Sequence, residues 1–499
     1  MKYIKRTSLF LGLLSLLFTV SCEDVLDQSP ASEISEEQFW QSNNDANAGV
    51  AAIYDAMQEH YAQRYFQYGE FRSDNHIVTD APSEGALELG SNTLQSRSGY
   101  CEWTNLYAMI SRANLAIEKI PQINGFDPNY LAEAYALRSY AYFDIFRVWG
   151  QAPVFTEAIR TPQEELARPA TDGETILNEI VLPDMLRAEE LMTNLAEEFR
   201  FSLTSVWAHQ ANVYMWLKDY AKAKEKLDLI VASDAFSLAQ SRDEWQDMFS
   251  NDSGDGESPK IQEGPELIMS LFYDNEAGDR SGVYAQFYAG IPSYFISSLA
   301  ESKWIAAFPT DSLAWVAKYP DPTDLPKSFV RDADGNDTDQ LLFGDWRYFE
   351  TREEGRDIGE ARVAKWNKSN YSPSLDNTDI VLFRYAGVLM MLAEAENQLG
   401  NSARALELLN RIRTARQLPN VNEASFTALS QEERESLILD ERQFELFGEA
   451  KRFWDLQRTD RAVPVMQPIN GQTEATLIFP YYFPHLQVNP KLEQLPPYQ

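Results

Sequence analysis

The stretch LILDERQFELFGEAKRFWDLQRT, residues 437–459, is the part of the sequence from which the fold can be inferred. Just before it, Ser430 is followed three residues later by Glu433, which is the spacing of a helix capping box. Gly448 lies where a helix of roughly 17 residues would end. The sequence therefore predicts one helix between Ser430 and Gly448, with a second charged segment after it.

The predicted helix has charged residues on the face that should meet the core. Leu437 and Phe444 share one side of it, yet the positions three and four after Leu437 are Asp440 and Glu441. A buried carboxylate without a partner is too costly to stay ionised, so we predict a partly buried network of ion pairs. The expected members are Glu441 and Glu445 as acids, with Arg442, Arg452 or Arg458 as bases. A catalytic role for the glutamates is the alternative, although structural ion pairs in packed helices are commoner.

The composition of the chain limits its functional class. The chain has 499 residues, 44% of them hydrophobic, so it can bury sizeable cores. Its formal net charge of −33 repels phosphate backbones and argues against a nucleic-acid partner. The 11 Trp and 24 Tyr residues suit a sugar ligand, because flat aromatic rings pack against the C–H faces of sugar rings.

The N-terminus has the form of an export signal with a lipid attachment site. Three basic residues precede an apolar run over residues 9–20, which is too short for a membrane span and is soon followed by Cys22. We predict that residues 1–21 are a lipoprotein signal peptide, that Cys22 carries the lipid and that residues 22–45 form a tether. An ordinary secretory signal is the alternative. If Cys22 is lipidated, Cys101 has no disulfide partner within the chain.

Helical hairpins are expected on both sides of a central insertion. Residues 46–232 and 378–499 place apolar side chains at helical spacing, with turns at Lys218 and Gly400 and alanines on the faces that meet. This is the pattern of tetratricopeptide repeats, so we predict an all-α scaffold. Because the repeats lie on both sides of residues 233–377, they must meet in space, and the chain should form one intertwined unit.

Two parts of the chain have no helical period. Residues 233–377 contain polar loops, many prolines and scattered aromatic residues, which predicts irregular loops, short helices and a few strands around a recognition surface. Residues 70–102 are broken by Pro82 and by glycines. Aperiodic stretches of that length in a compact fold are usually functional or disordered.

Several segments together resemble one family. LDERQFEL at 439–446 and RFWDL at 452–456 resemble the most recognisable block of the SusD/RagB family, the lipid-anchored nutrient-binding proteins of the Bacteroidota outer membrane. FRYAGVLMMLAEA at 383–395 and LNRIR at 409–413 match the family as well. The resemblance implies a SusD-like fold and a non-catalytic lipoprotein on the cell surface. Such a protein would capture an oligosaccharide or polysaccharide and deliver it to a SusC-like TonB-dependent β-barrel transporter.

The expected ligand surface combines the two aperiodic regions. Sugar hydroxyls need hydrogen-bond donors and acceptors, and sugar rings need aromatic platforms. We predict hydrogen bonds from Asp74, Asn75 and Arg97, and stacking on Tyr284, Tyr288 and Trp315. Any one of these aromatic residues could instead belong to the core.

No metal, cofactor or catalytic motif stands out in the sequence. Residues 332–339 alternate oxygen-bearing side chains, but Gly335 and Phe343 break the EF-hand pattern, so we expect a solvated loop. Neither a nucleotide loop nor a zinc-protease or hydrolase motif is present. Two other functions stay open: a repeat scaffold that binds peptides or proteins, and a glycoside hydrolase, for which two carboxylates among 76 acidic residues carry no information.

Overall fold

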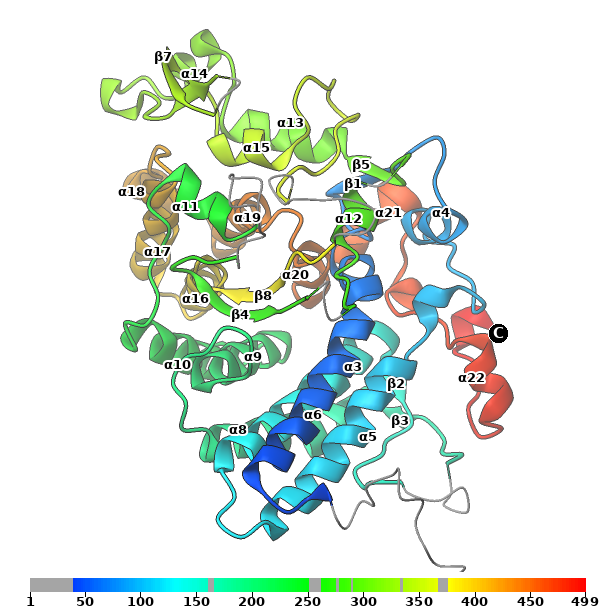
Figure 1. Cartoon of the computed structure of the whole chain (residues 1–499). Helices are drawn as coiled ribbons and strands as arrows, with labels where there is room; N and C mark the ends of the chain where they lie inside the picture. The colour runs from blue at the N-terminus through cyan, green and yellow to red at the C-terminus, as the bar shows by residue number, and fades with distance from the viewer. Residues whose placement is uncertain are drawn as a thin grey trace, which may run out of the picture.

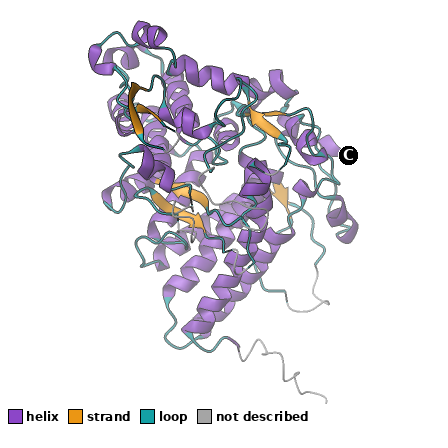
Figure 2. Cartoon of the chain, turned by 45° about the horizontal axis from the view of Figure 1, so that its top comes forward, coloured by secondary structure: helices purple, strands orange, loops and turns teal. Residues whose placement is uncertain are grey.

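The computed structural model describes residues 39–159, 166–250, 262–274, 278–288, 290–332, 335–366 and 376–499. Helices dominate these residues and the strands are short, which confirms the all-α prediction (Figures 1 and 2). The predicted signal peptide, Cys22 and most of the predicted tether lie outside the described residues.

Long helices from the first half of the chain form the lower part of the molecule in Figure 1. The helix α6 is buried along nearly its whole length, because α3, α5 and α8 pack around it. Pro128 occupies its first turn, and it stops at Gly150, whose φ is +75°. The elements are α3 (Asn43–Gly69), α4 (Glu84–Gly90), η3 (Gly99–Cys101), α5 (Thr104–Lys119), η4 (Ile120–Gln122), α6 (Pro128–Trp149), α7 (Gly173–Ile176), the π-helical turn η5 (Leu177–Val181) and α8 (Leu182–Leu191).

The two helical hairpins on either side of the insertion lie against each other. The first pairs α9 (Leu203–Trp216) with α10 (Tyr220–Ala232), and the second pairs α16 (Tyr385–Gln398) with α17 (Ser402–Ala415). The helices α10 and α16 are in direct contact, and Lys224 of α10 lies 3.5 Å from Glu396 of α16. The prediction that the separated hairpins meet in space is therefore confirmed.

The insertion is built from short elements, as its lack of a period predicted. They are α11 (Arg242–Asp247), β4 (Leu267–Leu271), α12 (Val283–Phe287), β5 (Tyr294–Ile296), α13 (Ser298–Ala307), α14 (Ser312–Lys318), η6 (Pro322–Asp324), β6 (Phe329–Arg331), β7 (Asp337–Leu341) and α15 (Trp346–Thr351). Among the described residues, the strands form four two-stranded antiparallel pairs. Two pairs tie the insertion to the helical parts: β5 with β1 (His76–Val78), and β4 with β8 (Ile380–Arg384). The other two are β2 (Gln151–Ala152) with β3 (Thr171–Asp172), and β6 with β7.

The C-terminal region contains the helix that the sequence predicts between Ser430 and Gly448. Its elements are α18 (Glu423–Ala428), α19 (Gln431–Glu445), α20 (Arg452–Arg458), α21 (Ala462–Asn470), η7 (Glu474–Thr476), α22 (Phe483–Val488) and η8 (Pro496–Tyr498). Ser430 caps α19 through the predicted capping box: the Glu433 amide donates to Ser430 Oγ at 3.3 Å, and the Ser430 amide donates to Glu433 Oε2 at 2.7 Å. The helix ends at Glu445, slightly before the expected stop, and Gly448 then turns the chain with a φ of +77°.

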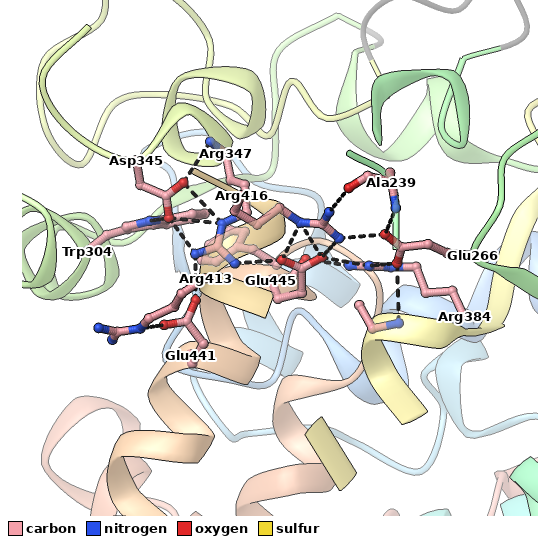
Figure 3. A network of polar contacts seen from close by, with 12 residues as sticks. Ala239, Glu266, Trp304, Asp345, Arg347, Arg384, Arg413, Arg416, Glu441 and Glu445 are labelled. Carbon is pink, nitrogen blue, oxygen red and sulfur yellow. Dashed lines mark hydrogen bonds and ion pairs between the residues drawn. The ribbon is translucent and has the colours of Figure 1, made fainter. Parts of the chain in front are cut away.

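The charged face of α19 is buried in a network of ion pairs, the α19 network, which Figure 3 shows. Glu445 accepts hydrogen bonds from Arg347 at 2.6 Å, Arg384 at 2.7 Å and Arg416 at 2.8 Å. Glu441 pairs with Arg347 at 2.7 Å and with an arginine of α17. Burial alone would raise the pKa of Glu445, but the three guanidinium groups outweigh it and hold that pKa well below its usual value.

The predicted network exists, but its predicted partners are wrong. Glu441 and Glu445 pair with arginines from α15, β8 and the C-terminal end of α17, namely Arg347, Arg384, Arg413 and Arg416. The arginines that follow the two glutamates in sequence lie elsewhere around α19 and α20 and pair with other acids: Arg442 with Asp455, Arg458 with Glu394 and Asp455, and Arg452 with Asp74. Adjacent residues on one helix project in different directions, so sequence neighbours were poor candidates.

Candidate functional site

The sequence-predicted ligand residues do not share one surface. Asp74 and Asn75 are buried, with exposed fractions of 4% and 0%. Asp74 accepts two hydrogen bonds from Arg452, at 2.7 and 2.9 Å. Asn75 accepts one from Gln443 at 2.7 Å and donates to Glu70 at 2.7 Å. Their polar atoms join the 70–76 turn to α19 and α20, so we remove both residues from the candidate ligand surface.

Trp315 is also an interior residue. It is 1% exposed, donates its indole N–H to the Asp324 carbonyl at 3.0 Å, and packs against Tyr319 and Phe343. Its helix α14 lies in the lobe at the upper left of Figure 1, whereas α4 and α12 lie toward the right. Trp315 therefore forms the local core of that lobe, apart from the other predicted ligand residues.

Arg97 lies in a cleft of about 400 Å³, which we call the Arg97 cleft. Three segments form it: the second half of α3, the start of α4 and the turn that leads into η3. Arg97 itself is exposed, and Tyr100 is half-buried. The lining residues are Gln63, Arg64, Glu84, Gly85, Glu88, Arg97, Ser98, Gly99 and Tyr100.

Hydrogen bonds hold the wall of the cleft in place. Arg64 of α3 donates to the Gly99 carbonyl at 2.8 Å and to Glu102 at 3.1 Å, which fixes the η3 turn against the helix. Gly85 is needed for close packing, because a Cβ at this position would come within 2.9 Å of the Tyr100 ring. Burial raises the pKa of the Tyr100 hydroxyl, so it is neutral at pH 7 and can both donate and accept hydrogen bonds.

The helix α12, which carries Tyr284 and ends just before Tyr288, lies beside the same stretch of α3. Its Gln286 bonds Gln67 at 3.1 Å and the Ala62 carbonyl at 3.0 Å, next to the part of α3 that lines the cleft. Tyr284 and Tyr288 are half-buried. Of the predicted ligand residues, the structure thus brings Arg97, Tyr284 and Tyr288 to the same region of α3.

The cleft offers chemistry that suits polyhydroxylated ligands. It combines a guanidinium group, two carboxylates, an amide and a phenol, from Arg97, Glu84, Glu88, Gln63 and Tyr100. These groups can donate to and accept from sugar hydroxyls, and a volume of about 400 Å³ is within the usual range of small-ligand pockets. The sequence did not single out Gln63, Glu84 and Glu88, because polar residues on a helix surface give no periodic signal that separates a cleft from solvent.

The described ranges contain neither a cluster of metal ligands nor a helix that could span a membrane. There, no group of three or more His, Cys, Asp and Glu side chains is arranged to hold a metal ion. Within the same ranges, no helix has both the length and the apolar composition that a bilayer crossing requires.

Comparison with known proteins gives one consistent family. Residues 351–498 match the model described as the SusD family, and residues 24–215 match one described as "Starch-binding associating with outer membrane". The SusD-like protein P38 of Formosa agariphila is 44% identical, and the alignment covers 100% of both chains.

The fold likewise resembles solved structures. A SusD superfamily protein from Bacteroides vulgatus superposes with a TM-score of 0.71 at 16% identity, over 92% of this chain and 99% of that one. A structure titled "Laminarin binding SusD-like protein" gives a TM-score of 0.66 at 19% identity, over 92% of this chain and 100% of that one.

Proposed function

Because the chain belongs to the SusD family, we propose that it is a glycan-binding protein that captures an oligosaccharide or polysaccharide without breaking it. We place the ligand in the Arg97 cleft, extending along α3 toward Tyr284 and Tyr288. The observation that carries this assignment is the cleft itself, in which Arg97, Glu88 and Tyr100 lie around one hollow of about 400 Å³. The laminarin-binding structure of the same fold supports a β-glucan as the first ligand to test.

Two further parts of the proposal concern location and partner. We propose that Cys22 carries a lipid that anchors the protein to the outer membrane, facing the cell surface, and that a SusC-like TonB-dependent transporter receives the glycan. The family description "associating with outer membrane" supports the location. Metabolic labelling with a fatty-acid analogue tests the anchor: label should be incorporated into the wild-type protein and lost in Cys22→Ala.

Isothermal titration of the purified protein against a panel of soluble glycans tests ligand binding. The panel includes laminarin, starch and mannan, and each mixture is also analysed for shortened products. We expect one glycan class to bind and no product to appear. Arg97→Ala and Tyr100→Ala should each weaken binding about tenfold, the effect of losing roughly 1.4 kcal/mol of polar or stacking contact.

Arg187→Ala is the matched control, since Arg187 is an exposed arginine of α8 that pairs with Glu190 of the same helix and does not line the Arg97 cleft. It should bind like the wild type. Release of shorter sugars would show that the protein is a hydrolase. Binding of peptides in place of every glycan would favour a repeat-type peptide receptor.

A further inference from the structure

A second hollow lies in the interior, where α3, α6, α9, α16, α19 and β8 converge with the turn before α20. Its volume is about 50 Å³, and we call it the Lys451 cavity. Cavities need about 10–15 Å³ to hold one water molecule, so this one has room for a small polyatomic ion or a few waters. The charged groups in its wall are Arg147, Arg384, Arg442, Glu449, Lys451 and Asp455.

The two carboxylates in the wall are fully engaged with other cations. Glu449 accepts hydrogen bonds from Lys365 and, at 2.9 Å to each oxygen, from Arg384. Asp455 accepts one from Arg442 at 2.7 Å and two from Arg458, at 2.7 and 3.2 Å. Among the described residues, these two carboxylates therefore accept no hydrogen bond from Lys451 or Arg147.

The basic groups of the wall have donors to spare. The ammonium of Lys451 carries three protons, and among the described residues it donates to two acceptors, the Tyr65 hydroxyl and the Leu382 carbonyl. In the part of the chain that the structure describes, the Nε–H of Arg147 finds no hydrogen-bond partner, although Arg147 is only 6% exposed. A buried donor without an acceptor costs roughly 1–3 kcal/mol, so the cavity favours an occupant that accepts hydrogen bonds.

An anion fits this environment better than a neutral acceptor does. Lys451 makes no ion pair with any of the described residues, whereas Arg147 pairs with Asp144 and Arg442 with Asp455. An ammonium buried without a counter-ion is costly. We propose that the Lys451 cavity binds a small monovalent anion, of the size of a halide or formate, between Lys451 and Arg147.

The charge of Lys451 makes binding depend on pH. Burial lowers the pKa of Lys451 to about 7; Glu449 and Asp455 oppose the shift, while Arg442 and Arg147 add to it. Tyr65 and Arg384 also face this group from α3 and β8. Below pH 7 the ammonium is charged and attracts an anion, and above pH 7 it is largely neutral. The anion should therefore bind more tightly at pH 6 than at pH 9.

Gly387 provides a substitution that can replace the anion. It lines the cavity in the first turn of α16, and the atoms nearest to a Cβ there would be two Leu446 carbons, at 3.7 and 3.9 Å, and an Arg442 nitrogen at 4.0 Å. Those are ordinary contacts, so a longer side chain can enter the space. Gly387→Glu would place a permanent carboxylate among the basic groups, and Gly387→Ala is its uncharged control.

The test is thermal unfolding of the purified protein in increasing sodium bromide, with sodium gluconate keeping the ionic strength constant because gluconate is too large for the cavity. We expect bromide to raise the melting temperature of the wild type to a plateau, by several degrees at pH 6 and by less at pH 9. Lys451→Met should lose the response. Gly387→Glu should melt higher than Gly387→Ala without bromide and should not respond to it, while Gly387→Ala should respond.

A bromide-soaked crystal gives a second, independent readout. An anomalous peak within hydrogen-bonding distance of Lys451 is expected in the wild type and not in Gly387→Glu. Lys303→Met serves as a control for loss of a lysine, because Lys303 pairs with Asp440 away from this cavity, and it should keep the full bromide response. A cavity filled by water alone, or an equal bromide response in wild type and Gly387→Glu, would overturn the proposal.

Discussion

At the scale of single residues, the most demanding contact lies where α3 meets the turn before α20. Glu70 follows the last residue of α3 and accepts hydrogen bonds from the amides of Gly448, at 3.1 Å, and Ala450, at 2.9 Å. This brings the backbone of the turn so close to α3 that a Cβ on Gly69 would lie 2.0 Å from the Ala450 carbonyl oxygen. Only glycine fits at this position without displacing the turn.

Gly69→Ala should therefore destabilise the protein, even though alanine favours a helix more than glycine does. The overlap with the Ala450 backbone must be relieved by moving the turn, which typically costs about 1–3 kcal/mol. Gly99→Ala is the control, because a Cβ at Gly99 has no heavy atom within 4 Å. Urea unfolding measures both variants, and equal midpoints for the two alanine variants would contradict this account.

At the scale of elements, local signals in the sequence were accurate where one helix end depends on adjacent residues. The capping box at Ser430 and the turn at Gly400 both occur in the structure because each is decided within a few residues of chain. The partners of Glu441 could not be found in this way. Its partner Arg347 is 94 residues away in sequence and reaches α19 only because α15 packs on it.

Contacts between residues far apart in sequence also explain why some predicted ligand residues are buried. Asp74 and Asn75 have the polar side chains of a binding loop, yet they are buried by α19 and α20, which lie more than 300 residues later in sequence. Trp315 lies in the aperiodic insertion, where no apolar period distinguishes a core aromatic residue from a stacking platform. Arg97 is exposed, as a ligand-contacting residue must be, whereas Asp74 and Asn75 of the same aperiodic stretch are buried; the role of Arg97 in ligand binding stays a prediction.

Removal of the α19 cap should weaken the C-terminal region. Ser430→Ala takes away the acceptor for the Glu433 amide and should lower the free energy of unfolding by about 1 kcal/mol. Ser430→Asn keeps an acceptor at the same position and should stay within a few tenths of the wild type. Chemical denaturation of the three proteins distinguishes them, and an asparagine variant as unstable as the alanine variant would show that the cap is not the cause.

At the scale of the whole molecule, the α19 network joins parts that are far apart in the chain. Arg347 comes from the insertion, Arg384 from β8 and Arg416 from the end of α17, and all three converge on Glu445 (Figure 3). Glu266, at the start of the β4 strand, bridges Arg384 and Arg416 as well. Loss of Glu445 would therefore leave each of the three buried guanidinium groups with one counter-charge fewer, although each keeps at least one other carboxylate.

Stability in acid should depend on this network. The pKa of Glu445 is well below its ordinary value of 4.5 in the folded protein, so its contribution is complete above pH 4.5 and is lost as the pH falls through the folded pKa. Between the folded pKa and pH 4.5, Glu445 is protonated in the unfolded state but still ionised in the folded state. Glu445 alone should then reduce the free energy of unfolding by up to about 1.4 kcal/mol per pH unit.

Glu445→Gln tests this contribution by difference. The variant should be less stable than the wild type at pH 7 by about 3–5 kcal/mol, because three buried arginines lose their shared carboxylate. Below pH 4.5 its stability should fall less steeply, so the two proteins approach each other. Glu133, whose pKa is raised by burial to about 7, has the opposite pH dependence but is present in both proteins and cancels. Glu432→Gln changes an exposed carboxylate of the same helix and should follow the wild type at every pH. Parallel stability curves for wild type and Glu445→Gln between pH 3 and 7 would mean that folding does not lower the pKa of Glu445.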